Sequence, residues 1–370
     1  MSEMLAGKPL RKKRRRRRKK RFLNFSNLFQ FQNQHIYYAL LALWGLVLLT
    51  GGGLPFFSKA LALIGMGALM VWKPPRLSVH PWIWLGCLGA LLLTLAMLFL
   101  PRLGGVGSTF APLVENFQLD ISNTLSIQPR ATLEILFIQV ALIGTLFLVL
   151  NNPLSSASRK EMVRVLIVVL ACFGMGILAG NAVNARWVFA EEAQVFSFIA
   201  NRNQMANLMM IGVVFCFATT WESMEKKGNW ALLGVFLLVV LFLALFQLRS
   251  RACLILAFLG ILTWITWKSM RGRRAPYIKA GIPVTLLLFS LFLYFGDESR
   301  DRVLDQISAG TSLAADFRLL IFQDAMAMFL ERPWTGFGYG NFEVVFPQFR
   351  ELTFQAERIV HPESDLFWLL

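Results

Sequence analysis

Long apolar segments recur along almost the whole chain, and they constrain the fold more than any other feature. Nine of these segments and the start of a tenth at Leu366 can be recognised: Tyr37–Thr50, Phe57–Trp72, Pro81–Leu100, Thr132–Leu150, Met162–Gly180, Gln204–Trp221, Trp230–Gln247, Ala252–Trp267 and Ile278–Gly296. In lipid, backbone polar groups must be hydrogen-bonded internally, and the alternating pattern of barrel strands is absent from these segments. The sequence therefore predicts membrane-spanning helices.

The composition supports this interpretation, because 56% hydrophobic and 13% aromatic residues exceed what a water-soluble domain carries. We expect an all-α, polytopic transmembrane helical bundle with about ten visible spans, and further helices in a longer protein because the tenth segment is cut short at Leu370. The first two segments, around "TGGGLPFF", are compatible with two spans or with one re-entrant hairpin. Both alternatives leave the side of every later loop unchanged.

The distribution of Lys and Arg predicts the orientation. The segment Lys8–Arg21 holds twelve of the 37 Lys and Arg residues, and every loop on the same predicted side is also basic. By the positive-inside rule this side is cytoplasmic. A basic tail beside a first span is better explained as an orientation signal that contacts anionic phospholipid than as a nucleic-acid-binding segment. We expect a cytoplasmic tail (1–34), a transmembrane region (35–296), a large outer loop (297–364) and the start of a further helix (365–370).

The basic residues also differ in type between the two sides. Beyond the tail, the inner loops hold six Lys and six Arg, whereas the outer segments hold twelve Arg and one Lys, Lys59. Arginine binds phosphate through a planar fork of N–H groups and tolerates partial burial better than lysine does. This bias suits an anionic, lipid-linked diphosphate ligand. Pairing with outer carboxylates or lipid headgroups is the alternative.

Two short outer motifs contain candidate binding residues. In "FIANRNQMAN", the polar side chains of Asn201, Arg202, Asn203 and Asn207 come at the start of a span, where carboxamides bind sugar hydroxyls or cap a helix. In "LRSRACL", Arg249 and Arg251 interrupt two nearly continuous apolar runs. Charges so close to a membrane usually mark a functional site, and snorkelling toward headgroups is the competing explanation.

The large outer loop contains the candidate catalytic residues. "TSLAADFRLLIFQDAMAMFLERP" predicts an amphipathic helix with Arg318 and Asp324 on or near its polar side, followed by a glycine-rich corner "PWTGFGYGNF". Near the end of the chain, His361 lies close to Glu363 and Asp365, which can orient an imidazole and raise its basicity for general-base catalysis. No second histidine is predicted on this side, and the four cysteines stand singly, so the sequence predicts no metal site.

Taken together, these motifs resemble a known family. The run "FRLLIFQDAMAMFLERPWTGFGYGNFEVVFPQFR", with "NRNQMAN" and "SRACL" upstream and "HPESDLFWLL" at the end, is similar to the O-antigen ligase and polymerase superfamily of bacterial membrane glycosyltransferases, over roughly residues 130–370. The resemblance implies a multi-pass protein of the bacterial inner membrane. It also implies transfer of a glycan from undecaprenyl diphosphate to an acceptor on the periplasmic face, without nucleotide sugar, cofactor or metal.

The resemblance also assigns roles to residues. It places Arg249 or Arg251 and Arg318 on the diphosphate, and it makes His361 the base that deprotonates the acceptor hydroxyl. Many family members have Asn directly after this His. Here Pro362, Glu363 and Ser364 intervene, so either Asp365 or Glu363 replaces that Asn as the orienting group, or the His has a different register.

Ligase activity with a lipid A core acceptor is the preferred interpretation. A polymerase that extends a growing O-antigen or exopolysaccharide glycan, and transfer to a protein Ser or Thr, are alternatives. A transporter of small anions or inorganic carbon is the alternative from another class, although the sequence contains no inverted repeat with broken helices. The sequence makes no prediction of the oligomeric state.

Overall fold

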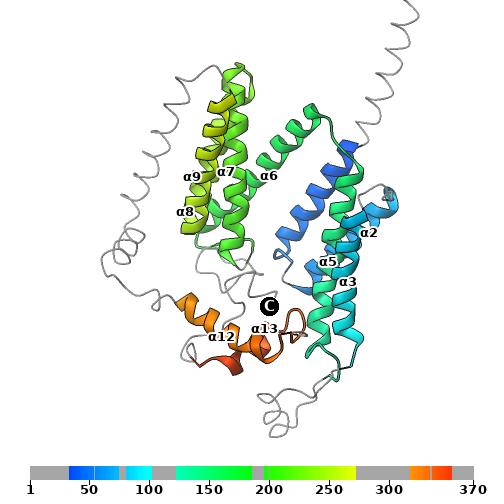
Figure 1. Ribbon diagram of the computed structural model, residues 1–370. Helices are drawn as coiled ribbons and strands as arrows, with labels where there is room; N and C mark the ends of the chain where they lie inside the picture. The colour runs from blue at the N-terminus through cyan, green and yellow to red at the C-terminus, as the bar shows by residue number, and fades with distance from the viewer. Residues whose placement is uncertain are drawn as a thin grey trace, which may run out of the picture. The chain divides into compact units, whose positions relative to one another are not determined.

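A computed structural model describes residues 33–53, 55–74, 81–101, 122–185, 196–199, 201–271, 317–333 and 336–351 (Figure 1). Within these ranges the regular elements are all helical, and the only β pairing is an isolated bridge between Pro101 and Thr124. The first helix covers Asn33–Leu49. The others are α2 (Phe56–Trp72), α3 (Pro81–Phe99), α5 (Pro129–Asn151), α6 (Ser156–Ala182), α7 (Arg202–Glu225), α8 (Trp230–Gln247), α9 (Arg251–Arg271), α12 (Phe317–Glu331), α13 (Phe342–Val345) and the 3₁₀ helix η2 (Phe346–Phe349).

The predicted all-α polytopic fold is confirmed. Among the residues that the structure describes, five helices (α3, α5, α6, α7 and α8) are long and apolar enough to cross a membrane, and three shorter apolar helices accompany them. The predicted segment at Ile278–Gly296 and the one that begins at Leu366 lie outside the described residues. The two segments around "TGGGLPFF" form separate helices joined by a turn in which Gly51, Gly52 and Gly53 have positive φ.

Several helices begin earlier than the apolar pattern predicts, because a polar first turn precedes the apolar run. Helix α6 starts at Ser156 rather than Met162, and the Ser155 hydroxyl caps it by accepting a 3.1 Å hydrogen bond from the Ser158 N–H. A side-chain cap satisfies one of the free N–H groups at a helix start. The caps therefore define these boundaries better than hydrophobicity does.

The chain divides into two compact units, and the first comprises residues 1–52, 65–78 and 144–257. In it, α6, α7 and α8 pack against one another (Figure 1). Glycines allow close approach: a Cβ added to Gly174 would lie 3.3 Å from the Ala244 Cβ, and one added to Gly212 would lie 3.1 Å from a Leu241 methyl group. Small residues at helix contacts are typical of membrane bundles, where packing rather than water exclusion drives association.

The second unit comprises residues 53–64, 79–143 and 258–370. Within it, α12 packs through Ile321 and Ala325 against Phe342 and Phe346, whose rings stack with centroids 4.5 Å apart. This packing corrects one prediction. Asp324 was expected on or near the polar side of the helix, but it is only 3% exposed. It lies between Ile321 and Ala325 on the turn that faces α13 and η2, which the helical periodicity alone did not identify.

Candidate functional site

The start of α7 is held by the first residue of the predicted carboxamide motif. Asn201 is the N-cap of the helix, and its side-chain oxygen accepts a 2.9 Å hydrogen bond from the Asn203 N–H. The capping explanation is therefore the observed one for Asn201. Arg202 and Asn203 follow in the first turn and are partly exposed, whereas Asn207 is exposed one turn later.

Asn207 contacts a residue far away in the sequence. The thiol of Cys253, on the first turn of α9, donates a 3.1 Å hydrogen bond to the Asn207 Oδ1 atom. The same sulfur lies 3.8 Å from the Asn203 carbonyl oxygen. Because Asn203 and Asn207 are four positions apart, both contacts come from one face of α7. Cys253 itself is 3% exposed and lies beneath the exposed Asn207 carboxamide.

The turn between α8 and α9 presents the two predicted arginines. Helix α8 ends at Gln247, and Arg249 has φ +52°. The residue that adopts this left-handed conformation just after a helix end is usually Gly or Asn. The Arg249 N–H donates a 3.0 Å hydrogen bond to the Phe246 carbonyl oxygen. Arg249 is exposed, whereas Ser250 beside it is only 4% exposed. Arg251 is the first residue of α9, two positions before Cys253.

Two of the predicted outer sites are therefore one site. The contact between Cys253 and Asn207 joins the start of α7 to the start of α9, so "NRNQMAN" and "LRSRACL" meet at one end of the same unit. The combined surface carries the exposed Arg249 beside the carboxamides of Asn203 and Asn207, so it is rich in hydrogen-bond donors. Such a set of groups is suited to bind an anion with attached hydroxyl groups. We call it the α7/α9 site.

The second unit contains a buried hydrogen-bond chain that anchors the glycine-rich corner. Asn341 Nδ2 donates to the Ser126 hydroxyl at 2.9 Å, the Ser126 and Thr132 hydroxyls are 2.7 Å apart, and Thr132 donates to the Tyr339 carbonyl oxygen at 2.7 Å. Asn341 also accepts a 3.1 Å hydrogen bond from the Gln128 N–H. Asn341, Ser126 and Thr132 are all fully buried, and aligned donors in such a chain strengthen one another.

The glycines of this corner are required by its geometry. Gly338 and Gly340 have φ +93° and +81°, and a Cβ on Gly338 would lie 2.7 Å from Asn341 Nδ2 and 2.8 Å from Ser126 Cα. The interpretation of "PWTGFGYGNF" as a tight corner rather than a phosphate-binding loop therefore agrees with its contacts. The corner contacts the segment that leads into α5 through Ser126, Gln128 and Thr132. The sequence pattern predicted no function for these three residues.

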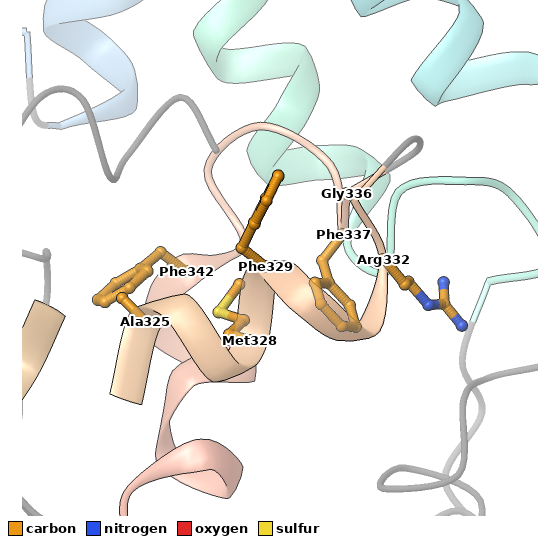
Figure 2. Close-up of a pocket in the computed structure, with 7 residues that line it drawn as sticks. All are labelled: Ala325, Met328, Phe329, Arg332, Gly336, Phe337 and Phe342. Carbon is orange, nitrogen blue, oxygen red and sulfur yellow. The ribbon is translucent and has the colours of Figure 1, made fainter. Parts of the chain in front are cut away.

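A pocket lies between α12 and the glycine-rich corner (Figure 2). Its lining residues are Ala325, Met328, Phe329, Arg332, Gly336, Phe337 and Phe342. The Arg332 guanidinium carbon lies 5.0 Å from the centre of the Phe337 ring, and Figure 2 shows its side chain extending away from Met328 and Phe342. Partial burial lowers the pKa of Arg332, and the nearby Glu331 carboxylate opposes that change. A guanidinium remains charged in proteins, so Arg332 brings a positive charge to this pocket.

A third polar contact lies at the start of α5. Lys59 Nζ is 2.7 Å from a Glu134 carboxylate oxygen, and Arg130 approaches the other carboxylate oxygen at 3.6 Å. The Lys59 and Glu134 side chains are 16% and 19% exposed, whereas Arg130 is 85% exposed. The single lysine of the predicted outer segments is therefore half-buried and paired with a carboxylate. This arrangement indicates a structural role for Lys59.

The remaining predicted residues are only partly described. Arg318 lies in the first turn of α12, where the structure describes its backbone but not its side chain. His361, Glu363 and Asp365 lie outside the described residues. Among the residues that the structure does describe, no group of three or more His, Cys, Asp or Glu side chains could hold a metal ion.

Comparison with known proteins gives one match. Residues 235–370 match the O-antigen ligase (Wzy_C) family, whereas no curated protein and no solved structure matches the chain. The matched region begins inside α8 and contains Arg249, Arg251, Cys253, Arg318 and His361. The motif "NRNQMAN" precedes it, so the α7 side of the α7/α9 site lies outside the matched region. Residues 235–370 thus confirm the resemblance to the O-antigen ligase and polymerase superfamily and support a multi-pass, glycosyltransferase-like membrane enzyme.

Proposed function

We propose that this protein transfers a glycan from undecaprenyl diphosphate to an acceptor hydroxyl at the periplasmic face of the bacterial inner membrane. The observation that carries the proposal is the junction of the arginine turn with the carboxamide end of α7, through the Cys253–Asn207 hydrogen bond. The family match over residues 235–370 supports the reaction class. The lipid A core is our first choice of acceptor, which makes the protein a ligase rather than a polymerase.

The proposed role of the arginines follows from the charge that develops during the reaction. When the bond between the anomeric carbon and the diphosphate breaks, negative charge accumulates on the leaving oxygen. Guanidinium groups held in place before the reaction stabilise that charge without reorganising. We assign Arg249 and Arg251 to this role, with Arg318 as a further ligand of the diphosphate. Arg202 and Asn203 are then available to the glycan.

His361 is the proposed general base. The acceptor hydroxyl needs to lose its proton as it attacks from the side opposite the diphosphate, which predicts inversion at the anomeric carbon. Glu363 or Asp365 orients the imidazole. A histidine base loses activity when it is protonated, so the transfer rate should fall as the solution becomes acidic.

The proposed orientation rests on the basic residues. Lys226 and Lys227 lie in the turn between α7 and α8, at the opposite end of α7 from Asn201. With the basic side in the cytoplasm, the α7/α9 site faces the periplasm. The tail, through residues 8–21, contacts anionic phospholipid. Deletion of residues 1–21 tests this role, because it should lower the amount of inserted protein while leaving the activity per inserted molecule unchanged.

A pair of matched substitutions tests the role of the arginine turn. Arg249 and Lys227 both follow a helix end and have nearly the same φ, +52° and +50°. Replacing either by glycine relieves the same backbone strain. In membrane vesicles containing the full-length protein, Arg249→Gly should reduce release of undecaprenyl diphosphate from a lipid-linked oligosaccharide at least tenfold, about 1.4 kcal/mol of transition-state stabilisation. Lys227→Gly should retain wild-type release. Equal release by both variants would remove Arg249 from the site.

A further inference from the structure

The carboxamide of Asn207 has two chemically different ends, and only one of them is engaged by the protein. Its oxygen accepts the hydrogen bond from the Cys253 thiol. Its nitrogen, a donor of two hydrogen bonds, has no partner among the residues that the structure describes, and the side chain is exposed. The orientation of the amide is therefore set by the thiol, which is a donor and selects the oxygen.

We propose that Asn207 donates a hydrogen bond to a phosphate oxygen of the lipid-linked donor, and that Cys253 is the positioning residue that presents its N–H groups. The inference rests on the proposed function, because it concerns the same α7/α9 site. It assigns to the diphosphate a residue that sequence analysis had placed among glycan-binding candidates. A diphosphate accepts hydrogen bonds but donates none when ionised, so a carboxamide that offers only its nitrogen end is matched to it.

The neighbours of Asn207 favour a phosphate over a sugar hydroxyl. Cys253 lies on the first turn of α9, two positions after Arg251 and four after Arg249. A sugar hydroxyl both donates and accepts, so it gains from a carboxamide that offers both of its ends. Here the Cys253 thiol occupies the accepting oxygen at 3.1 Å, and the donating nitrogen is left exposed at the end of the unit where the turn carries the charged Arg249. Oriented donors beside such charge favour an anion.

Burial supports the positioning role of the thiol. Cys253 is 3% exposed, so its sulfur hydrogen-bonds within the protein rather than to water. Its second acceptor, the Asn203 carbonyl oxygen at 3.8 Å, is on the same face of α7. The thiol therefore keeps its hydrogen directed toward α7. The other buried cysteine described in this unit is Cys216 in the middle of α7, and its thiol donates to the Gly234 carbonyl oxygen of α8 at 3.3 Å.

Three substitutions separate this role from a purely structural one. Asn207→Asp keeps the shape of the side chain but replaces its donor by a carboxylate oxygen. Cys253→Ser keeps a donor, and Cys253→Val fills the same space without one. Cys216→Val is the matched control, because it removes a buried thiol from the same unit without touching the site. The probes are undecaprenyl diphosphate alone and the oligosaccharide freed from its lipid, each titrated against the full-length protein in vesicles.

We expect Asn207→Asp to raise the Kd for undecaprenyl diphosphate at least about tenfold, and Cys253→Val to raise it about three- to tenfold. Cys253→Ser and Cys216→Val should bind it as the wild type does, and no variant should change the Kd for the free oligosaccharide. An unchanged Kd for undecaprenyl diphosphate in Asn207→Asp would overturn the inference, as would equal losses in Cys253→Val and Cys253→Ser. These results would leave the proposed function intact. Failure of the wild type itself to bind undecaprenyl diphosphate would overturn both.

Discussion

The buried carboxamide of Asn341 donates a 2.9 Å hydrogen bond to the hydroxyl of Ser126, 215 positions earlier in the chain. The Ser126 hydroxyl is in turn hydrogen-bonded to the Thr132 hydroxyl, which donates to the Tyr339 carbonyl oxygen. The chain of hydrogen bonds thus begins and ends in the glycine-rich corner and passes through the segment that leads into α5. It fixes the end of α12, and hence the segment that carries Arg318, against the first turn of a membrane helix.

Replacing Asn341 should destabilise this corner more than any replacement of an exposed residue would. Asn341→Leu leaves the buried Ser126 hydroxyl and Gln128 N–H without their partner, which should lower the free energy of unfolding by about 2–4 kcal/mol. Limited proteolysis of the protein in detergent should then cut within residues 336–351 sooner than in the wild type. Asn151→Leu is the control, because the Asn151 carboxamide donates a 2.8 Å hydrogen bond to the Phe147 carbonyl oxygen at the other end of α5, in the other compact unit. Equal cleavage rates in the two variants would contradict the anchoring role.

The glycine at position 338 gives a second test of the same corner. Gly338→Ala places a methyl group where Asn341 Nδ2 and Ser126 Cα already lie, in a left-handed backbone conformation. The thermal midpoint should fall, because both the clash and the backbone strain oppose folding. Gly86→Ala in α3 has nothing within 4 Å of the added methyl group and should leave the midpoint unchanged or raise it. A Gly338→Ala protein with an unchanged midpoint would show that the corner tolerates a side chain.

The Lys59–Glu134 pair should behave as a half-buried ion pair. Glu134→Gln leaves the Lys59 ammonium without its 2.7 Å partner, and Lys59→Met leaves the Glu134 carboxylate with only the exposed Arg130 at 3.6 Å. Each variant should lose about 1–3 kcal/mol of stability. The double variant should lose less than the sum of the single losses, which a double-mutant cycle of thermal unfolding measures. Additive losses would mean that the 2.7 Å contact contributes no coupling.

The helices could be predicted from the sequence because each is a long apolar segment. The polar contacts between distant segments could not be predicted. Ser126, Thr132 and Asn341 lie in or next to loops, where no periodicity marks a buried residue. The hydrogen bonds from Asn341 to Ser126 and from Thr132 to Tyr339 join residues more than 200 positions apart. Cys253 likewise stands singly in an apolar segment, where nothing in the sequence marks its contact with Asn207. Asp324 shows the converse error, since a charged residue was expected near the polar side of α12 and is in fact buried.

The candidate site was recognised through its charges. The prevalence of arginine over lysine in the predicted outer segments, and two polar motifs at the ends of apolar runs, indicated Arg249, Arg251 and Asn207. The two motifs meet through the contacts of Cys253 with Asn203 and Asn207, which a single sequence does not reveal. The boundary of the family match at residue 235 also falls later than the roughly 130 that the resemblance suggested.

The central claim is that an arginine-bound diphosphate leaves as His361 deprotonates the acceptor. It is tested most directly by measuring release of undecaprenyl diphosphate from a lipid-linked oligosaccharide, using full-length wild type, His361→Ala and Arg318→Ala in membrane vesicles with acceptor present. We predict release by the wild type and a loss of at least about a hundredfold in each variant at equal protein abundance. Undiminished release by both variants would contradict the proposed site. Absence of release from the wild type, together with uptake of a labelled small anion into vesicles, would instead identify a transporter.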